Sequence, residues 1–155
     1  GVKLININTA DEMLNEVKAL ITNMDIFIGC AAVADFKPVD FHNSKIKKDH
    51  NDEISLKLIK NPDILQYASD HMKEKLVIGF SAETDNVIEN AKIKLLKKNL
   101  NMIICNDVSN KEIGFDSDNN EVHLITHDDV VKLTKTSKLK IAKQIIKSIE
   151  ALIAN

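Results

Sequence analysis

Short apolar segments that suit strands alternate with longer segments that carry helical spacing, and this alternation predicts an α/β fold with a mostly parallel sheet. Helix-capping residues stand before the helical segments, which supports the same class. We therefore expect a three-layer, Rossmann-like domain that ends in a β-hairpin-like element and a C-terminal helix. At 155 residues the chain fits one domain of ordinary size, spanning residues 1–155.

The first half of the sequence supplies three predicted strands and two predicted helices. The strands are expected at residues 2–7, 25–31 and 54–59. The second of them is apolar enough for burial on both faces. A capping box at residues 9–12 opens a helix that should end near Ile21. Asn61 and Pro62 supply an N-cap and a first-turn proline for a helix that reaches about Met72.

The second half continues the alternation. Strands are expected at residues 76–80, 102–105 and 121–126. Asn86, with Glu89 three residues later, matches a capping box for a helix that ends near Lys98. The final helix should span Ser137 to Ile153. Its apolar residues at helical spacing are Leu139, Ala142, Ile145, Ile146 and Ile149.

Composition places the chain among ordinary globular proteins, because 44% of its residues are hydrophobic and 28% are charged. A formal net charge of -2 leaves no basic surplus for a nucleic-acid backbone, so no nucleic-acid partner is expected. No apolar run approaches the roughly 18 residues that a membrane helix needs, and no basic-then-apolar leader precedes Val2. These features predict no membrane association and a cytoplasmic location.

Cysteine, histidine and glycine usage narrows the chemistry. Cys30 and Cys105 each end an apolar, strand-like run, which predicts buried and reduced thiols. The histidines form no metal-binding pair, so no protein metal site is expected. The chain has four glycines and neither a G-x-G-x-x-G nor a Walker A loop. Either phosphates are held by another device, or the front of a nucleotide-binding fold is missing.

The loop after the second predicted strand is the first candidate for chemistry, because loops at the carboxyl ends of parallel strands carry the ligands of α/β proteins. It contains Asp35 and four lysines: Lys37, Lys45, Lys47 and Lys48. A short lysine run is more often a solvated surface than an anion site. Residues 61–64 favour an anion site, because free backbone amides at a helix start suit a phosphate or nucleotide oxygen.

Two further features have alternative interpretations. Gly29 and Gly79 end strands, where the absence of a side chain lets a ligand approach the backbone. Phe80 is then either a stacking surface for a ligand or a core residue. Lys94 and Lys98 lie four residues apart on one helical face. Either an anion such as a phosphate chain compensates their repulsion, or both point into water.

Several segments are informative when they are considered as a series: AAVADFKP (31–38), KIKK (45–48), LIKNPDIL (58–65), VIGFSAETDN (77–86), the helix with Lys94 and Lys98, and NDVSNKEIGFDSDNNEVHLI (106–125). In their order and separations, along nearly the whole chain, they resemble the bacterial phosphopantothenoylcysteine synthetase family, also called phosphopantothenate-cysteine ligase. No single one of these motifs is specific. The resemblance lies in the series.

The resemblance implies a ligase of coenzyme A biosynthesis. In that family the carboxylate of 4'-phosphopantothenate attacks the α-phosphate of CTP, which gives an acyl-cytidylate and pyrophosphate, and the amine of L-cysteine then displaces CMP. The implied nucleotide contacts are Gly29, Asp35, Lys45, Pro62, Asp63, Ile64, Leu65, Phe80, Lys94 and Lys98. Lys45 is also the implied catalytic residue, and Lys94 and Lys98 would hold the triphosphate with Mg²⁺. The resemblance further implies a homodimer and a phosphopantothenoylcysteine decarboxylase that is either fused to the ligase or associated with it.

The sequence departs from the family at its amino-terminal end. Family members usually place a strand, an N-x-S-S-G-x-M-G segment and a helix before the equivalent of Val2, and residues 1–155 do not contain them. Because the asparagine of that segment is associated with the attack of cysteine, we expect activity of these residues alone to stop at, or before, the acyl-cytidylate. The alternative function is a non-catalytic nucleotide-binding module. A flavodoxin-like signalling domain would need an acidic cluster after the first strand, and residues 6–9 contain none.

Overall fold

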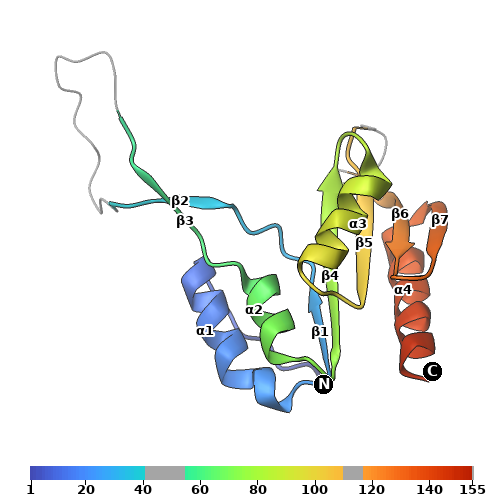
Figure 1. Cartoon of the computed structure of the whole chain (residues 1–155), viewed down its shortest axis with the longest axis horizontal. Coiled ribbons are helices and arrows are strands. Elements are labelled where there is room, and N and C mark those ends of the chain that lie inside the picture. The colour runs from blue at the N-terminus through green and yellow to red at the C-terminus, as the bar shows by residue number, and fades with distance from the viewer. Residues whose placement is uncertain (41–54, 110–116, 155) are drawn as a thin grey trace.

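The computed structural model describes residues 1–40, 55–109 and 117–154, and a five-stranded sheet forms its centre (Figure 1). In spatial order, the strands are β1 (Ile26–Gly29), β4 (Leu76–Glu83), β5 (Met102–Asp107), β6 (Asn119–Ile125) and β7 (Val130–Ser137). The first three are parallel to one another, whereas β6 and β7 run antiparallel and form a hairpin at the far edge. This arrangement confirms the predicted fold class.

Helices cover both faces of the sheet, so the fold has the three predicted layers. One face carries α1 (Ala10–Leu20), the short 3₁₀ helix η1 (Ile21–Asn23), α2 (Ile64–His71) and α3 (Val87–Lys97). The other carries α4 (Lys138–Ile153), which contacts β6 and β7. Side chains of β5 alternate between the two cores: Ile103 and Cys105 face α1 to α3, and Ile104 faces α4. Within the described ranges, no helix is both long and apolar enough to cross a membrane.

β1 is an edge strand, which corrects the expectation that both of its faces are buried. Phe27 belongs to the core under α1 and α2, but Ile28 on the opposite face is 38% exposed. The reason is position, because the main contacts of α4 are with β6 and β7 at the far edge of the sheet. Position also separates the two cysteines: Cys105 in the central β5 is buried as predicted, whereas Cys30 after β1 is exposed.

The amino-terminal residues form no strand, contrary to the prediction for residues 2–7. Val2 and Leu4 are 96% and 82% exposed, so the apolar residues of this segment are not buried within the described chain. A strand needs a neighbour for its backbone groups, and sequence periodicity does not provide one. The capping box that follows is confirmed. The Thr9 hydroxyl accepts from the Glu12 N–H at 3.1 Å, and the Glu12 carboxylate accepts from the Thr9 N–H at 3.2 Å.

Two other helix starts differ from the sequence interpretation. α2 is capped by Asp63, whose carboxylate accepts a first-turn N–H at 3.0 Å, so Asn61 and Pro62 lie before the helix. Asn86 does precede α3, but it is in the left-handed conformation with φ of 43° and makes no side-chain cap hydrogen bond. The capping box predicted there is therefore absent. Both Asn and Asp are good N-caps, so the sequence alone could not choose between Asn61 and Asp63.

The final helix begins as predicted but packs through a different stripe. Ser137 is its N-cap and accepts a first-turn N–H at 3.4 Å. The buried residues are Ile141, Ile145 and Ile149, of which only the last two were in the predicted stripe. The other predicted members are exposed: Leu139, Ala142 and Ile146. Apolar residues surround much of this helix, so the sheet decides which of them are buried.

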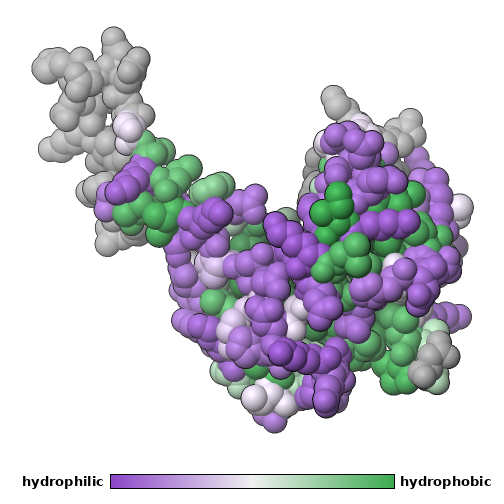
Figure 2. Space-filling model, viewed as in Figure 1, coloured by the Kyte–Doolittle hydropathy of each residue, from purple (hydrophilic) through white to green (hydrophobic). Residues whose placement is uncertain are grey.

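A two-stranded ribbon extends from the body of the molecule (Figure 1). It pairs β2 (Phe36–Pro38) with β3 (Leu58–Lys60) in antiparallel register. β3 replaces the strand predicted at residues 54–59, of which residue 54 lies outside the described ranges, and β2 is an element that the sequence did not predict. Figure 2 shows hydrophobic surface along this ribbon. Its exposed apolar residues are Phe36, Val39, Leu56, Leu58 and Ile59.

Adjacent isoleucines of α4 provide a test of this packing. Ile145 is 7% exposed and belongs to the core under α4, whereas Ile146 is 47% exposed. Ile145→Ala should lower the free energy of unfolding by about 2–5 kcal/mol, because it removes buried methyl groups and leaves a cavity. Ile146→Ala is the matched control and should cost less than about 1 kcal/mol. Urea denaturation followed by circular dichroism measures both losses, and equal losses would contradict the assigned stripe.

Candidate functional site

A cavity of about 840 Å³ opens at the base of the ribbon. Its walls are the loop of residues 31–35, the start of α2, the C-terminal half of β4 and the C-terminal part of α3. In Figure 2 the surface is hollowed between the ribbon and α3, and hydrophilic residues dominate around the hollow. The cavity lies beside the carboxyl ends of parallel strands, where α/β folds bind ligands, and its volume is typical of small-molecule sites.

The predicted site residues converge on this cavity wherever the structure describes them. Those that line it are Gly29, Asp35, Pro62, Asp63, Ile64, Leu65, Phe80, Lys94 and Lys98. They come from four segments that are distant in sequence, and the fold brings them together. Lys45, with Lys47 and Lys48, lies outside the described residues, so its placement stays a prediction.

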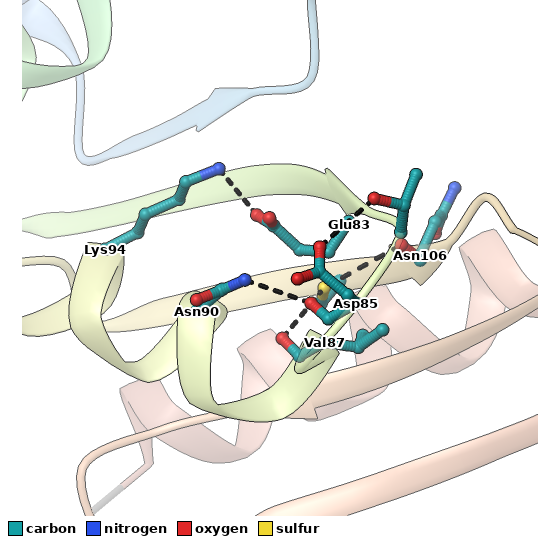
Figure 3. Close-up of polar contacts among 8 residues, drawn as sticks. Glu83, Asp85, Val87, Asn90, Lys94 and Asn106 are labelled. Carbon is teal, nitrogen blue, oxygen red and sulfur yellow. Dashed lines mark hydrogen bonds and ion pairs between the residues drawn. The ribbon is translucent and has the colours of Figure 1, made fainter.

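Carboxylates of the protein hold the two site lysines of α3 and its C-cap. The Nζ atom of Lys94 lies 2.5 Å from Oε1 of Glu83 (Figure 3). The Nζ atom of Lys98 lies 2.8 Å and 2.7 Å from the two carboxylate oxygens of Asp63. The charges of Lys94 and Lys98 are therefore compensated by anions, and these anions are carboxylate side chains of the protein itself. Both pairs are partly exposed to solvent, so a polyanion can exchange with the carboxylates at modest cost.

Asp63 has two partners that stabilise its ionised form. Besides meeting Lys98, its Oδ1 accepts a hydrogen bond from the N–H of Gln66 at the start of α2. Burial raises the pKa of Asp63, but the hydrogen bonds from Lys98 and Gln66, with the charges of Lys98 and Lys97, outweigh burial and lower the pKa below its usual value. Asp63 thus places a negative charge at the positive end of α2.

The two glycines serve the packing of α2 more than the approach of a ligand. A Cβ at Gly79 would lie 2.8 Å from Cδ2 of Leu65 and 2.9 Å from Cδ1 of Leu100. A Cβ at Gly29 would lie 3.2 Å from Cδ1 of Leu65. Gly79 also lies within β4 and not at its end, and only Gly29 lines the cavity. The small residues therefore let α2 sit close to the sheet.

Phe80 combines the two alternatives considered for it. The residue is half-buried and packs against the core under α4. It also lines the cavity. Core contacts hold the ring in place, and its remaining surface is available to a ligand.

Several lining residues were not identified from the sequence. They are Met13, Phe27, residues 31–34, Phe36, Lys60, Ser81, Ala82, Lys97 and Ile103. Lys60 and Lys97 add positive charge, and the small side chains of residues 31–34 keep the loop narrow. Lys97 adjoins a predicted residue, but sequence spacing does not tell which neighbours face one cavity.

The chemistry available in the cavity is that of cationic side chains and backbone amides. Among the described residues, no group of three His, Cys, Asp or Glu could hold a metal ion. A magnesium ion that binds through phosphates needs only one or two carboxylates, so the site remains compatible with one. Burial raises the pKa of the Cys105 thiol, which disfavours a thiolate nucleophile. The arrangement suits an anionic ligand.

Comparisons with known proteins agree with the sequence resemblance. The family model described as "DNA/pantothenate metabolism flavoprotein C-terminal domain" matches residues 1–153. The chain is 44% identical over 149 residues to "Coenzyme A biosynthesis bifunctional protein CoaBC" of Borreliella burgdorferi, which covers 95% of this chain and 37% of that protein. The protein of the same name from Escherichia coli is 46% identical over 132 residues, covering 82% and 32%. The chain thus spans well under half the length of these curated relatives.

Solved structures share the fold. The crystal structure of the C-terminal domain of Coenzyme A biosynthesis bifunctional protein CoaBC matches with a TM-score of 0.77 and 32% identity, over 97% of this chain and 65% of that chain. A Cab2 mutant in complex with phosphopantothenate-cysteine matches with a TM-score of 0.70, over 97% of this chain and 54% of that one. At 19% identity, the second likeness shows the fold alone.

The lowered pKa of Asp63 predicts an acid-sensitive contribution to stability. A carboxyl whose pKa is lower in the folded than in the unfolded state stabilises the fold above its unfolded value, and loses this contribution as pH falls through the folded value. Asp63→Asn keeps a cap acceptor but loses the ion pair, so it should flatten the fall of Tm between about pH 5 and pH 2.

Lys98→Met removes the same ion pair from the other side and serves as the matched variant. Thermal melts of the single and double variants across this pH range measure the effect. The double variant should flatten the curve no further than Asp63→Asn alone. An unchanged slope in Asp63→Asn would show that the pair contributes nothing to folding.

Proposed function

The chain belongs to the family described as the DNA/pantothenate metabolism flavoprotein C-terminal domain, and on this premise we propose that it carries the ligase site of a coenzyme A biosynthesis protein. The proposed reaction joins 4'-phosphopantothenate to L-cysteine at the expense of CTP. The names of the similar proteins support the pathway. The use of CTP and the reaction steps rest on the sequence resemblance.

One observation carries the proposal. Every predicted nucleotide contact that the structure describes lines a single cavity, although the contacts come from four distant segments. The cavity presents Lys94 and Lys98 on one side and the start of α2 on another. Cations and free helix-start amides are the groups that proteins use to hold phosphates.

The proposed chemistry has two balanced steps. A carboxylate oxygen of 4'-phosphopantothenate bonds to the α-phosphorus of CTP, and the bond to the bridging oxygen breaks to release pyrophosphate. The amine of L-cysteine then attacks the acyl carbon, loses a proton and expels CMP. The first step develops negative charge on the phosphate oxygens, so nearby cations lower its barrier. Lys45, outside the described residues, is proposed for that role, and a preorganised donor of this kind contributes about 3–4 kcal/mol.

Binding of a triphosphate would proceed by exchange of anions. Lys98 and Lys94 are already paired with Asp63 and Glu83, and a polyphosphate would take over these lysines. Mg²⁺, bound mainly by phosphates and water, would supply charge neutralisation, with the released carboxylates close by. Asp35 and the backbone of residues 62–65 face the same cavity and are proposed to hold the base and ribose.

Assembly and location are proposed on the same basis. We propose that the protein forms a homodimer in the cytoplasm and that a phosphopantothenoylcysteine decarboxylase is fused to it or associated with it. The similar proteins carry the word bifunctional in their names, which supports a fused second activity.

Pyrophosphate release by the full-length natural protein tests the function directly. We expect release with CTP and Mg²⁺ only when 4'-phosphopantothenate is present, and far slower release with ATP. Charged contacts dominate the proposed binding of the triphosphate, so the KM for CTP should rise with ionic strength. A nucleotide-binding module without catalysis would bind CTP in calorimetry but release no pyrophosphate. Equal or tighter binding of ATP would remove the basis for CTP.

A pair of lysine variants tests the phosphate contact. Lys98 lines the cavity, whereas Lys92 is exposed on the same helix and does not line it. Lys98→Gln should raise the KM for CTP by about 10–100-fold, because a charge-assisted contact is lost. Lys92→Gln is the control and should change it by less than about twofold. Steady-state kinetics at fixed ionic strength measures both, and equal effects would indicate bulk charge instead of a specific contact.

A further inference from the structure

Asn61 joins two walls of the cavity. Its backbone N–H donates to the carbonyl oxygen of Asp35 at 2.8 Å. Its side-chain Nδ2 donates to the carbonyl oxygen of Ala34, also at 2.8 Å. Asp35 and Ala34 belong to the loop after β1, whereas Asn61 stands directly before Pro62 and the start of α2. Two hydrogen bonds from one residue therefore tie the loop of residues 31–35 to the opposite wall.

The backbone at Asn61 is well suited to position a partner. The residue before a proline is restricted to extended conformations, and Pro62 has a fixed φ of its own. Asn61 also continues the ribbon ladder by one step, beyond the pair of Phe36 and Lys60. The restricted backbone limits where the Asn61 side chain can lie. The loop that is hydrogen-bonded to this side chain is therefore restricted as well.

Stability does not account for an asparagine at this position. Its Oδ1 is buried and has no hydrogen-bond partner among the described residues. An unpartnered buried acceptor costs at least as much free energy as one amide hydrogen bond contributes. Turning the amide over does not help, because Oδ1 would then face the Ala34 carbonyl oxygen. The cost of the buried oxygen offsets part of the gain from the Ala34 bond, so this side chain adds little to stability.

We propose that Asn61 is a positioning residue for the nucleotide. It sets the distance between the loop that carries Asp35 and the segment of residues 62–65, which are the two groups proposed to hold base and ribose. Asn61 itself needs no contact with the ligand. The identity of the ligand rests on the proposed function, whereas the effect on the loop does not.

The test uses Asn61→Ala and a matched control, Asn90→Ala, in the full-length natural protein. Asn90 makes the same kind of contact, from Nδ2 to the carbonyl oxygen of Asp85 at 3.0 Å, but does not line the cavity (Figure 3). Without ligand, amide hydrogen exchange at residues 32–35 should become at least about tenfold faster in Asn61→Ala. The KM for CTP should rise about tenfold, with kcat within about twofold and Tm within about 2 °C. Asn90→Ala should change neither the exchange nor the KM.

A second variant, Asn61→Asp, separates positioning from simple loss of a side chain. At about pH 8 its carboxylate has no proton for the Ala34 carbonyl and should act like Asn61→Ala. When the pH is lowered until the introduced carboxyl is protonated, it can donate to the Ala34 carbonyl again, so slow loop exchange should return toward the natural value. Neither the natural protein nor Asn61→Ala should show this recovery once intrinsic exchange rates are corrected for pH.

The possible outcomes decide the proposal. Faster loop exchange, recovery in Asn61→Asp at low pH and a raised KM support it. Unchanged exchange in Asn61→Ala overturns it, as does a large drop of Tm with a parallel loss of kcat, which would mean a general structural role. If the natural protein releases no pyrophosphate with CTP, the proposed function is wrong, and the exchange measurement still decides the role of Asn61.

Discussion

The position of α2 depends on the close contact of Leu65 with β4 at Gly79. A Cβ at Gly79 would come within 2.8 Å of Leu65 and 2.9 Å of Leu100, so a larger residue there would force these side chains to shift. Because α2 lies this close, its first turn stands beside the carboxyl ends of the parallel strands. Asp63 can then cap the helix and reach Lys98 beyond the end of α3. The loop after β1 and the base of the ribbon complete the cavity, held by the two bonds of Asn61.

The lysines of the cavity are paired with carboxylates that an anionic ligand would have to replace. Lys94 and Lys98 would repel each other on bare helix geometry, and Glu83 and Asp63 compensate them from two different elements. A ligand with one negative charge can replace only one of these carboxylates. A polyphosphate can replace both and still leave them near enough to meet a cation that it carries. These ion pairs are the reason why we propose a polyphosphate over a ligand with a single charge.

The parallel and antiparallel parts of the sheet have different roles. β1, β4 and β5 need crossover segments, and those segments supply α2, α3 and the ribbon that surround the cavity. A short turn is enough to connect β6 and β7. Helix α4 packs on these strands and covers the core on the opposite face of the sheet. Exposed apolar side chains lie along β1 and the ribbon, and also on α3 and α4, where they include Ile93, Leu96 and Leu139.

The sequence by itself predicted the α/β alternation, two helix caps and, through the family resemblance, nine of the residues that line the cavity. Alternation, the Thr9 capping box and the Ser137 cap are local patterns, and the carboxyl ends of parallel strands must share one edge. Only the tertiary structure decided which stripe of α4 is buried, that residues 1–7 form no strand and that Ile28 is exposed. It also decided that Asp63, not Asn61, caps α2, and that Lys94 and Lys98 each have a carboxylate partner. These features depend on neighbours distant in sequence, and a local pattern carries no information about which distant segment lies beside it.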